Sequence, residues 1–324
     1  MGNVTKPKLV TVFGGSGFLG RHVVSALAKR GYLVRVAVRR PELATHLQPL
    51  GGVGQIQTVQ ANLRVRWSVD RAVKDADHVI NLVGILFESG RQTFNAVQDF
   101  GARAVAEAAR AEGIGLTHVS AIGANPDSSS FYASSKGRGE AAVRQIVSDA
   151  IIIRPSILFG PEDDFFNKFA NMARFSPFLP LIGGGNTKLQ PVSVGDVAEV
   201  IARSVDGKLK AGTTYELGGP EVLTFRQCLE QMLRIIGRKR LFVSIPWGLA
   251  SFQARFLGLL PKPPLTRDQI RLLRVDNVVS EQAKAEGRTF DGLGIQPRTI
   301  EAILPAYLWR FREQGQFTGS KPSA

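Results

Sequence analysis

Tyr132 and Lys136 stand four residues apart in the stretch Tyr-Ala-Ser-Ser-Lys, and Ser120 lies twelve residues before the tyrosine. Residues i and i+4 share one face of a helix, so a helix here would place the phenol beside the ammonium. A neighbouring positive charge favours the tyrosinate and lowers the pKa of the phenol, which makes it a usable proton donor or acceptor nearer neutral pH. Ser120 could hold a carbonyl group or the phenol itself. These three candidate catalytic residues therefore predict proton transfer at a carbonyl or hydroxyl group.

A second stretch, Gly14-Gly15-Ser16-Gly17-Phe18-Leu19-Gly20, is suited to binding phosphate. It lies between an apolar β-branched run and a segment with apolar positions at helical spacing, that is, between a predicted strand and a predicted helix. Gly14 permits a tight turn, Gly17 lets a pyrophosphate approach the backbone, and Gly20 lets the helix pack close to the sheet. The alternative is a strand, turn and helix that bind nothing. The predicted cofactor contacts in this turn are Gly14, Ser16, Gly17, Phe18, Leu19 and Gly20.

Two guanidinium groups, Arg39 and Arg40, follow the next apolar run, residues 31–38. In an NAD site the end of this second strand usually offers a carboxylate to the ribose 2′-hydroxyl, whereas a planar guanidinium fits a 2′-phosphate. The pair therefore predicts NADP(H), written below as NADPH, rather than NAD(H); the alternative is a solvated basic pair. If such a nucleotide binds, Lys136 can also serve only to hold its ribose hydroxyls, with Tyr132 a binding group in a catalytically silent site.

The elements that must position these groups alternate along the first half of the chain. Apolar runs predict strands at 9–13, 31–38, 55–60, 78–84, 116–120 and 150–154, with helices between them, among them 94–111 and 131–147. This alternation predicts an α/β fold with a doubly wound parallel sheet and ligand at the carboxyl ends of its strands. We expect residues 1–160 to form this nucleotide-binding domain, with later segments returning to it. We expect residues 161–316 to form a smaller C-terminal α+β lobe and residues 317–324 a disordered tail.

The composition predicts a globular chain without a membrane span. No run of about 18 apolar residues occurs in the 324 residues. The first strand is expected so early that it leaves no room for a signal or transit peptide. A single cysteine, Cys228, excludes an internal disulfide and fits a reducing, cytoplasmic compartment. The histidines show no metal-ligand spacing, so no metal site is predicted.

Much of the net charge of +14 lies in one segment. Residues 234–274 contain nine Lys or Arg and one acid. The same segment carries Trp247, Phe252, Phe256 and Leu259, which can line one helix face. Basic charge around such a helix predicts docking on an anionic membrane surface or on an acidic partner. The alternative is an ordinary helix packed on the core. No nucleic-acid-binding motif occurs, and we expect no nucleic acid partner.

Taken together, these motifs resemble the short-chain dehydrogenase/reductase superfamily in its extended or atypical branch. Besides the glycine turn and the Tyr-Lys pair, the resemblance rests on Asn62-Leu63, on Asn81 to Gly84 and on Arg154 to Pro161. It implies that Asn62 and Leu63 lie by the adenine, that Val83 and Gly84 pass the ribose, and that Pro155 and Ile157 flank the nicotinamide.

Two departures from that branch concern its sugar-nucleotide epimerases. Those enzymes usually have an asparagine where this chain has Gln98, and their serine or threonine lies further before the tyrosine than Ser120 does here. Both departures count against sugar-nucleotide chemistry.

A narrower resemblance covers Val119 to Ala124 and Arg154 to Phe169. These stretches are similar to the nucleotide-binding accessory subunits of respiratory complex I and their bacterial relatives. The resemblance implies that the chain binds NADPH tightly, has complex I subunits as partners and stabilises the complex near its quinone site without turning over substrate.

Without a transit peptide, the chain is expected to be a bacterial member of that group. It would be cytoplasmic and peripheral on the cytoplasmic face of the inner membrane. The other interpretation is an enzyme, either an NADPH-dependent reductase or an NAD(P)-dependent epimerase or dehydratase, that uses Tyr132, Lys136 and Ser120.

Overall fold

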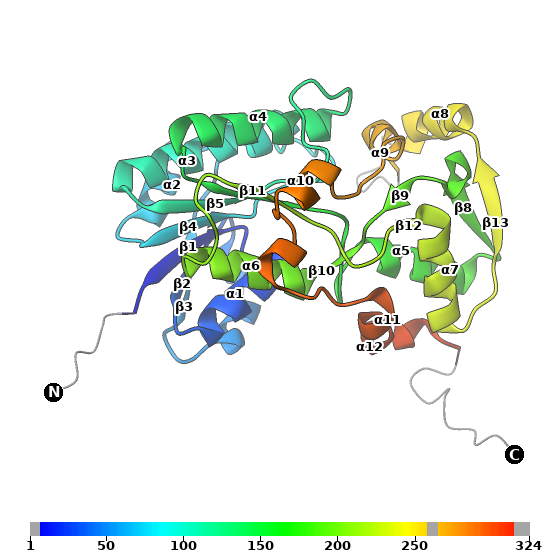
Figure 1. Ribbon diagram of the computed structural model, residues 1–324, viewed down its shortest axis with the longest axis horizontal. Coiled ribbons are helices and arrows are strands. Elements are labelled where there is room, and N and C mark those ends of the chain that lie inside the picture. The colour runs from blue at the N-terminus through cyan, green and yellow to red at the C-terminus, as the bar shows by residue number, and fades with distance from the viewer. Residues whose placement is uncertain (1–6, 258–264, 314–324) are drawn as a thin grey trace, which may run out of the picture. The chain divides into compact units, whose positions relative to one another are not determined.

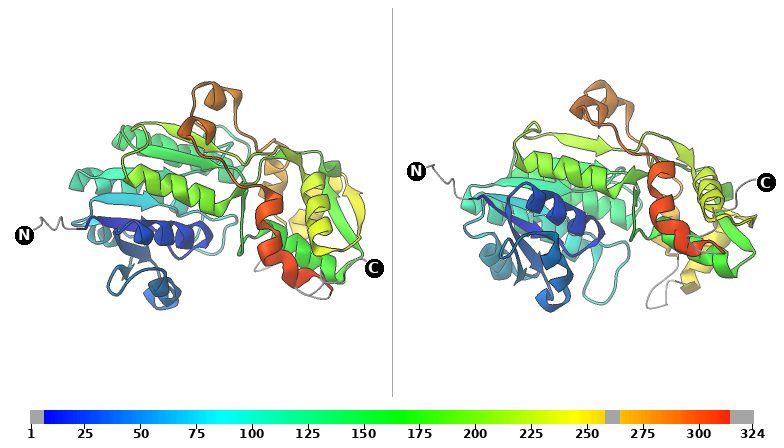
Figure 2. Two further views of the ribbon diagram at one scale, coloured as in Figure 1. Left: turned by 60° about the horizontal axis from the view of Figure 1, so that its bottom comes forward. Right: turned by 90° about the horizontal axis from the view of Figure 1, so that it is seen from below.

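The computed structural model describes residues 7–257 and 265–313 (Figures 1 and 2). The predicted disordered tail, residues 317–324, lies outside the described residues. The chain divides into two units, one of residues 1–154 with 197–215 and one of residues 155–196 with 216–324.

A seven-stranded sheet forms the centre of the first unit, in the order β3-β2-β1-β4-β5-β6-β11 (Figure 1). Its strands are β1 (Leu9–Phe13), β2 (Leu33–Val38), β3 (Ile56–Gln60), β4 (His78–Asn81), β5 (Gly115–Val119), β6 (Ile151–Pro155) and β11 (Thr214–Leu217). The pairings from β3 to β6 are parallel. The backbone hydrogen bonds between β6 and β11 run to higher residue numbers on both strands, so this pair is parallel too. The predicted doubly wound α/β fold is confirmed.

Helices cover both faces of this sheet (Figures 1 and 2). One face carries α1 (Phe18–Lys29) and α6 (Val194–Val205), and the other carries α2 (Arg66–Val73), α3 (Phe100–Glu112) and α4 (Phe131–Ile146). Val79, Val105 and Val143 are fully buried in the cluster between the sheet and α2, α3 and α4. Arg30, at the end of α1, donates to Glu199 at 2.7 Å and to Asp206 at 3.1 Å, and so ties α1 to α6.

The predicted helix over 94–111 begins differently from an ordinary α-helix. Its first turn, η3 (Asn95–Asp99), is a π-helix, and α3 follows it. A Cβ on Gly139 of α4 would lie 2.2 Å from the carbonyl oxygen of Gln98. The widened turn therefore brings a backbone carbonyl against α4, and only glycine leaves room for it there.

The second unit has a separate apolar core. It is enclosed by α5 (Phe165–Phe175), α7 (Phe225–Ile236), α11 (Ile300–Ile303) and α12 (Pro305–Leu308), with β8 (Phe178–Ile182) and β13 (Leu241–Ile245) paired in parallel. Thr224 begins α7 because its hydroxyl accepts from the Gln227 N–H in a capping box. The sequence predicts neither β8 nor β13, and Pro180 within β8 argues against a strand there.

Short elements complete the second unit. They are β7 (Leu158–Phe159), η4 (Gly183–Gly185), β9 (Lys188–Leu189), β10 (Val192–Ser193), β12 (Leu223–Thr224), α8 (Trp247–Leu257), α9 (Arg267–Leu272), α10 (Glu281–Ala285), η5 (Asp291–Leu293) and η6 (Trp309–Phe311). In the first unit, η1 (Pro41–Leu43) and η2 (Thr45–Leu50) lie between β2 and β3.

The predicted apolar helix in the basic segment is α8, but its aromatic residues do not share one face. Ala250 and Ala254 are buried in a small cluster, and Trp247 packs against that cluster. Leu249 and Phe252 lie on the exposed side, 50% and 61% accessible. The Phe256 side chain and Leu259 fall outside the described part of the chain. Within residues 7–257 and 265–313, no helix has the length and apolar character needed to cross a bilayer.

Candidate nucleotide-binding site

The glycine turn is built on backbone geometry that side chains would not allow. Gly14 has φ +78, and its carbonyl oxygen accepts from the Gly17 N–H at 3.0 Å. A Cβ on Gly20 would lie 2.3 Å from that same oxygen. Gly17 is the N-cap of α1 and has no side chain to cap the first turn. The first N–H groups of α1 are therefore available to an anion.

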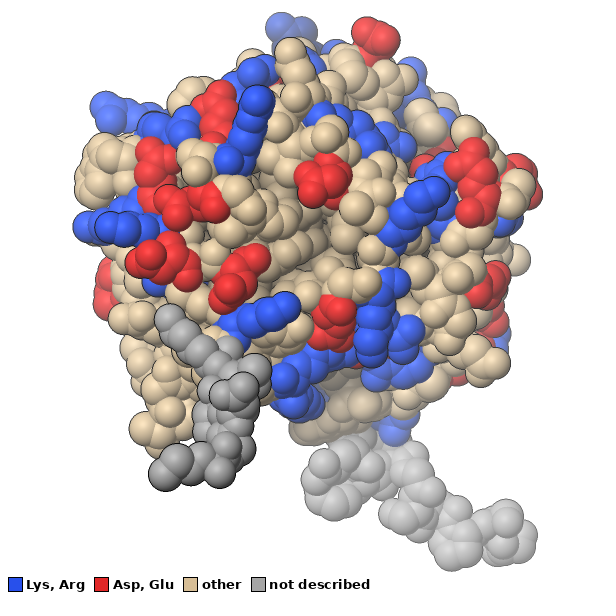
Figure 3. Space-filling model, turned by 60° about the vertical axis from the view of Figure 1, so that its left-hand side comes forward, with Lys and Arg blue, Asp and Glu red and all other residues tan. Residues whose placement is uncertain are grey.

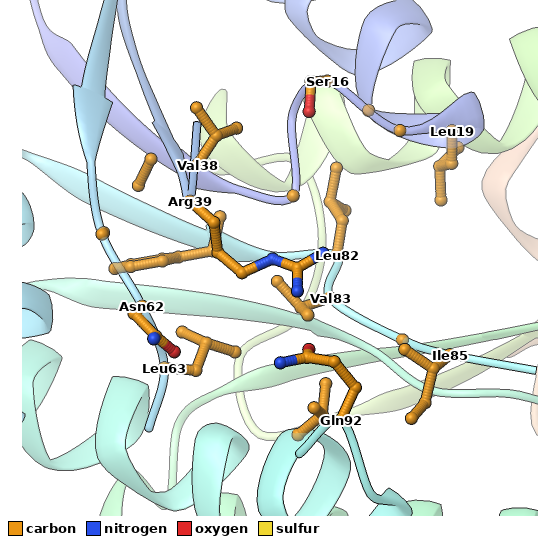
Figure 4. A pocket seen from close by; sticks show the side chains of 18 of the residues that line it. Ser16, Leu19, Val38, Arg39, Asn62, Leu63, Leu82, Val83, Ile85 and Gln92 are labelled. Carbon is orange, nitrogen blue, oxygen red and sulfur yellow. The ribbon is translucent and has the colours of Figure 1, made fainter. Parts of the chain in front are cut away.

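This turn lies where the strand order reverses. From β1 the chain moves to β2 and β3 on one side, and β4 then pairs with β1 on the other. The carboxyl ends of strands that flank such a switch point form a crevice. A cavity of about 340 Å³ lies there, lined by the glycine turn and by residues that follow β2, β3 and β4 (Figure 4).

Most of the predicted cofactor contacts line this cavity. They are Gly14, Ser16, Gly17, Phe18, Leu19, Gly20, Arg39, Asn62, Leu63, Val83 and Gly84. Four others are not among its lining residues: Arg40, Lys136, Pro155 and Ile157. Pro155 ends β6, and Ile157 packs against the core of the second unit.

The charge of the lining is positive. Figure 4 shows the Arg39 side chain extending from the end of β2 into the cavity, with the Gln92 amide on the opposite wall. Arg64, just after β3, also lines the cavity, and no Asp or Glu does so among the described residues. Sequence reasoning missed Arg64, although it directly follows Asn62-Leu63, which were singled out. An anionic ligand suits such a lining.

Two asparagines fix the backbone around the cavity. The Asn62 side-chain oxygen accepts from the Arg64 N–H at 3.1 Å, and the Asn81 oxygen accepts from the Val83 N–H at 3.1 Å. Each asparagine therefore holds the first residues after a strand in a tight turn, as Asx side chains commonly do.

Tyr132 and Lys136 occupy the start of α4, as predicted. The helix begins at Phe131 because the Ser130 hydroxyl accepts from the Ala133 N–H. Lys136 is buried, and its ammonium donates to the Val119 carbonyl at 3.1 Å. A Cβ on Gly84 would lie 3.2 Å from that ammonium, so Lys136 sits against a cavity-lining residue.

The pKa values in this region run against one prediction. Burial raises the pKa of Tyr132 to about 12, whereas the sequence predicts that Lys136 lowers it. Burial also lowers the pKa of Lys136 to about 8, which weakens its ability to stabilise a tyrosinate. The predicted direction is wrong because the sequence does not show how deeply α4 is buried. The Ser120 hydroxyl is buried and has no hydrogen-bond partner within the described residues.

Gln98, noted above only as a departure from a pattern, connects α4 to the cavity wall. Its amide nitrogen donates to the carbonyl of Ile85, a cavity-lining residue, at 2.8 Å. Its oxygen accepts from the Ser135 hydroxyl at 2.6 Å. Gln98 is buried in the π-helical turn, and it holds the strand-end loop of β4 against the helix that carries Tyr132 and Lys136.

A Rossmann-type α/β unit with a glycine turn and an anion-suited crevice defines a dinucleotide-binding protein class. The model of the NAD dependent epimerase/dehydratase family matches residues 10–218. The chain belongs to this family, which lies within the extended short-chain dehydrogenase/reductase branch named above.

Several relatives match nearly the whole chain. The Arabidopsis thaliana protein named mitochondrial NADH dehydrogenase (ubiquinone) 1 alpha subcomplex subunit 9 is 34% identical over 328 residues, covering 97% of this chain and 81% of that protein. The mitochondrial NADH-ubiquinone oxidoreductase 40 kDa subunit of Neurospora crassa is 31% identical over 95% of this chain and 80% of its own length. A ceramide reductase of Caulobacter vibrioides is 37% identical over 190 residues, 59% of this chain and 58% of that enzyme.

Solved structures share the fold at low identity. The NADPH-dependent quinone oxidoreductase QOR2 of Escherichia coli, in complex with NADPH, has a TM-score of 0.71 at 18% identity and covers 92% of this chain and 98% of its own. The UDP-glucose 4-epimerase of Thermus thermophilus, in complex with NAD, has a TM-score of 0.67 at 22% identity and covers 94% and 99%. The fold is thus that of NAD(P)-binding proteins.

Proposed function

We propose that this protein is an NADPH-binding accessory or assembly subunit of respiratory complex I, with a structural rather than a catalytic role. The observation that carries the proposal is the similarity, across 97% of the chain, to a protein named as a complex I subunit. The ceramide reductase matches a smaller part, 59% of the chain. Similarity that includes the second unit is what a shared docking role requires.

The bound nucleotide in this proposal is NADPH. The glycine turn and the first N–H groups of α1 would hold the pyrophosphate, and Arg39 would meet the 2′-phosphate. Asn62 and Leu63 would lie by the adenine, and Val83 and Gly84 by a ribose. The cationic lining, with no carboxylate among its described residues, favours the phosphorylated nucleotide. When bound, NADPH would supply a hydride donor, but the structural role uses it only as a fixed part of the fold.

The surroundings of Lys136 suit a structural role in this proposal, because its ammonium is buried and donates to the Val119 carbonyl. A phenol whose pKa is about 12 is a poor proton donor near neutral pH, because the ideal catalytic pKa lies near the working pH. A tightly held nucleotide instead stabilises the unit that binds it, since a ligand that binds only the folded state adds to the free energy of unfolding.

The exposed apolar residues of the second unit suit a membrane-facing position in this proposal. Leu241 and Val243 of β13 are 66% and 45% exposed, and Leu241 pairs with the exposed Phe178 of β8. Leu249 and Phe252 of α8 are also exposed. The sequence has seven Lys or Arg and no acid from Gln231 to Arg267, although one of them, Lys262, lies outside the described residues.

Apolar side chains on a basic background suit an anionic bilayer, into which such side chains insert while the cations meet headgroups. Over the face in Figure 3, by contrast, Lys and Arg lie mixed with Asp and Glu. We therefore place the protein on the cytoplasmic face of the inner membrane, peripheral to it and beside complex I subunits.

Flotation with phosphatidylglycerol vesicles tests the proposed binding to an anionic bilayer. The double substitution Leu249→Ser with Phe252→Ser should reduce the floated fraction several-fold. Equal flotation with neutral phosphatidylcholine vesicles would contradict the electrostatic part.

The experiment that tests the main proposal is affinity purification of the tagged full chain from mild-detergent extracts of its native membranes. Complex I subunits should co-purify, and acid extraction of the product should release NADPH or NADP⁺ in about one-to-one ratio to protein. An unrelated tagged Rossmann protein from the same membranes is the control. A preparation with nucleotide but without complex I subunits would refute the accessory role, and one without nucleotide would refute the binding role.

A second candidate function is an NADPH-dependent reductase, favoured by the buried and unpaired Ser120 hydroxyl beside the Tyr-Lys helix among the described residues. The identity of 37% to the ceramide reductase supports the same function. Its test is NADPH oxidation, followed by absorbance, with lipids of the ceramide class and simple ketones as probes. Turnover that disappears in Tyr132→Phe, while NADPH binding is unchanged, would establish the enzyme. No turnover with any probe supports the structural role.

A further inference from the structure

We propose that the 2′-phosphate of the nucleotide is recognised by Arg39 together with Arg64, and that Arg40 takes no part. This inference rests on the proposed NADPH binding. Of the two guanidinium groups that the sequence suggests, Arg39 and Arg40, it keeps Arg39 and replaces Arg40 with Arg64, which follows β3.

The sheet brings Arg39 and Arg64 to the same edge. β2 and β3 pair in parallel, with Val38 opposite Gln60 at their carboxyl ends. Arg39 follows β2 at once, and Arg64 comes in the turn after β3. Both residues line the same cavity at the switch point.

The turn that carries Arg64 is well fixed. The Val65 N–H donates to the Asn62 carbonyl at 2.8 Å, and the Ser68 hydroxyl accepts from the Asn62 N–H at 3.0 Å. With the Asn62 side chain also holding the Arg64 N–H, the backbone at Arg64 is set before any ligand binds. A preorganised cation loses little conformational freedom when it meets a phosphate.

The Arg64 guanidinium is only partly hydrogen-bonded within the described residues. One terminal nitrogen donates to the Arg91 carbonyl at 3.1 Å, whereas Nε is buried and has no hydrogen-bond partner within residues 7–257 and 265–313. A buried N–H without an acceptor is costly, and a cationic one more so. Among the described lining residues there is no carboxylate to neutralise the Arg64 guanidinium, so a phosphate in the cavity would supply the opposite charge.

Arg40 differs in place. Both Arg39 and Arg40 are exposed, but Arg40 directly precedes the 3₁₀ turn η1 and does not line the cavity, whereas Arg39 does. Its proximity to Arg39 in the sequence is therefore no guide to its role, because consecutive residues at a strand end point in different directions.

The test compares binding of NADPH, NADH and 2′,5′-ADP to the purified, nucleotide-stripped full chain by isothermal titration. Arg64→Gln should weaken NADPH and 2′,5′-ADP about 10- to 100-fold and change NADH less than about threefold, since a charge-assisted hydrogen bond to phosphate is lost. Arg39→Gln should behave alike. Arg40→Gln is the matched control and should bind all three ligands as the unsubstituted protein does.

Three other results would refute either the role of Arg64 or the proposed cofactor. Equal weakening of NADPH and NADH by Arg64→Gln would mean that Arg64 only supports the loop at Arg91, and would refute the inference. Loss of NADPH preference in Arg40→Gln but not in Arg64→Gln would also refute it, while leaving NADPH binding intact. If the unsubstituted protein binds NADH as well as NADPH, the proposed cofactor itself fails. Arg64→Lys, which keeps the charge, should recover part of the affinity and guards against a folding defect in Arg64→Gln.

Discussion

Gly20→Ala should disrupt the glycine turn, because the backbone of Gly14 and Gly15 lies directly against Gly20. The new Cβ would lie 2.3 Å from the Gly14 carbonyl oxygen and 2.6 Å from both the carbonyl carbon and the Cα of Gly15. All three are backbone atoms, so no side chain can rotate away. Because ordinary carbon contacts lie near 3.5 Å, α1 or the turn must move by roughly 1 Å.

The expected cost follows from overpacking, which destabilises by about 1–3 kcal/mol. For a unit of this size, that corresponds to a fall in Tm of about 2–12 °C. The same shift moves the first N–H groups of α1 away from the phosphates, so NADPH affinity should fall at least tenfold. Thermal unfolding followed by circular dichroism and NADPH titration measure the two effects.

Substitutions at two further glycines serve as comparisons for Gly20→Ala. Gly17→Ala places a Cβ only 3.3 Å from the Gly14 oxygen, with φ negative, so the fold should survive while the methyl group obstructs the pyrophosphate. Gly248→Ala, on an exposed helix position with nothing within 4 Å, should leave both measurements unchanged or raise Tm slightly. A Gly20→Ala protein with the Tm and NADPH affinity of the unsubstituted chain would refute this account of the turn.

Two other predictions concern buried polar groups. Because burial lowers the pKa of Lys136 to about 8, the unfolded chain binds more protons between pH 8 and pH 10.5, and this residue makes the free energy of unfolding rise with pH there. The difference in unfolding free energy between the unsubstituted protein and Lys136→Met, from urea titrations, should rise by on the order of 2 kcal/mol across that range; a flat difference would contradict the burial argument. Tyr307→Phe removes the hydroxyl that donates to the buried Asp163, and should cost about 1–3 kcal/mol in the same assay, whereas unchanged stability would show that Asp163 needs no donor there.

The parts of the fold that depend on local pattern could be predicted from the sequence. Apolar runs and helical spacing are properties of a few consecutive residues, and they predicted β1, β3 and α4 to within a residue. The glycine turn could also be predicted, because the types and spacing of its residues determine which backbone conformations they can adopt.

The parts that depend on neighbours from elsewhere in the chain could not be predicted. β8 needs β13, some 60 residues later, to complete its hydrogen bonds, and β11 joins the edge of the main sheet from beyond α6. The pKa of Tyr132 depends on how much protein covers α4, which no helical spacing reveals.

The sequence by itself determined that a dinucleotide-type turn exists and which residues form it, because turn geometry is set by adjacent residues. Only the tertiary structure decided which cations face the cavity. Arg39 and Arg64 both line it because β2 and β3 are neighbours in a parallel sheet, while Arg40, one residue from Arg39, does not line it. Charge complementarity acts through space, and the distances between strand ends are fixed by sheet pairing rather than by separation along the chain.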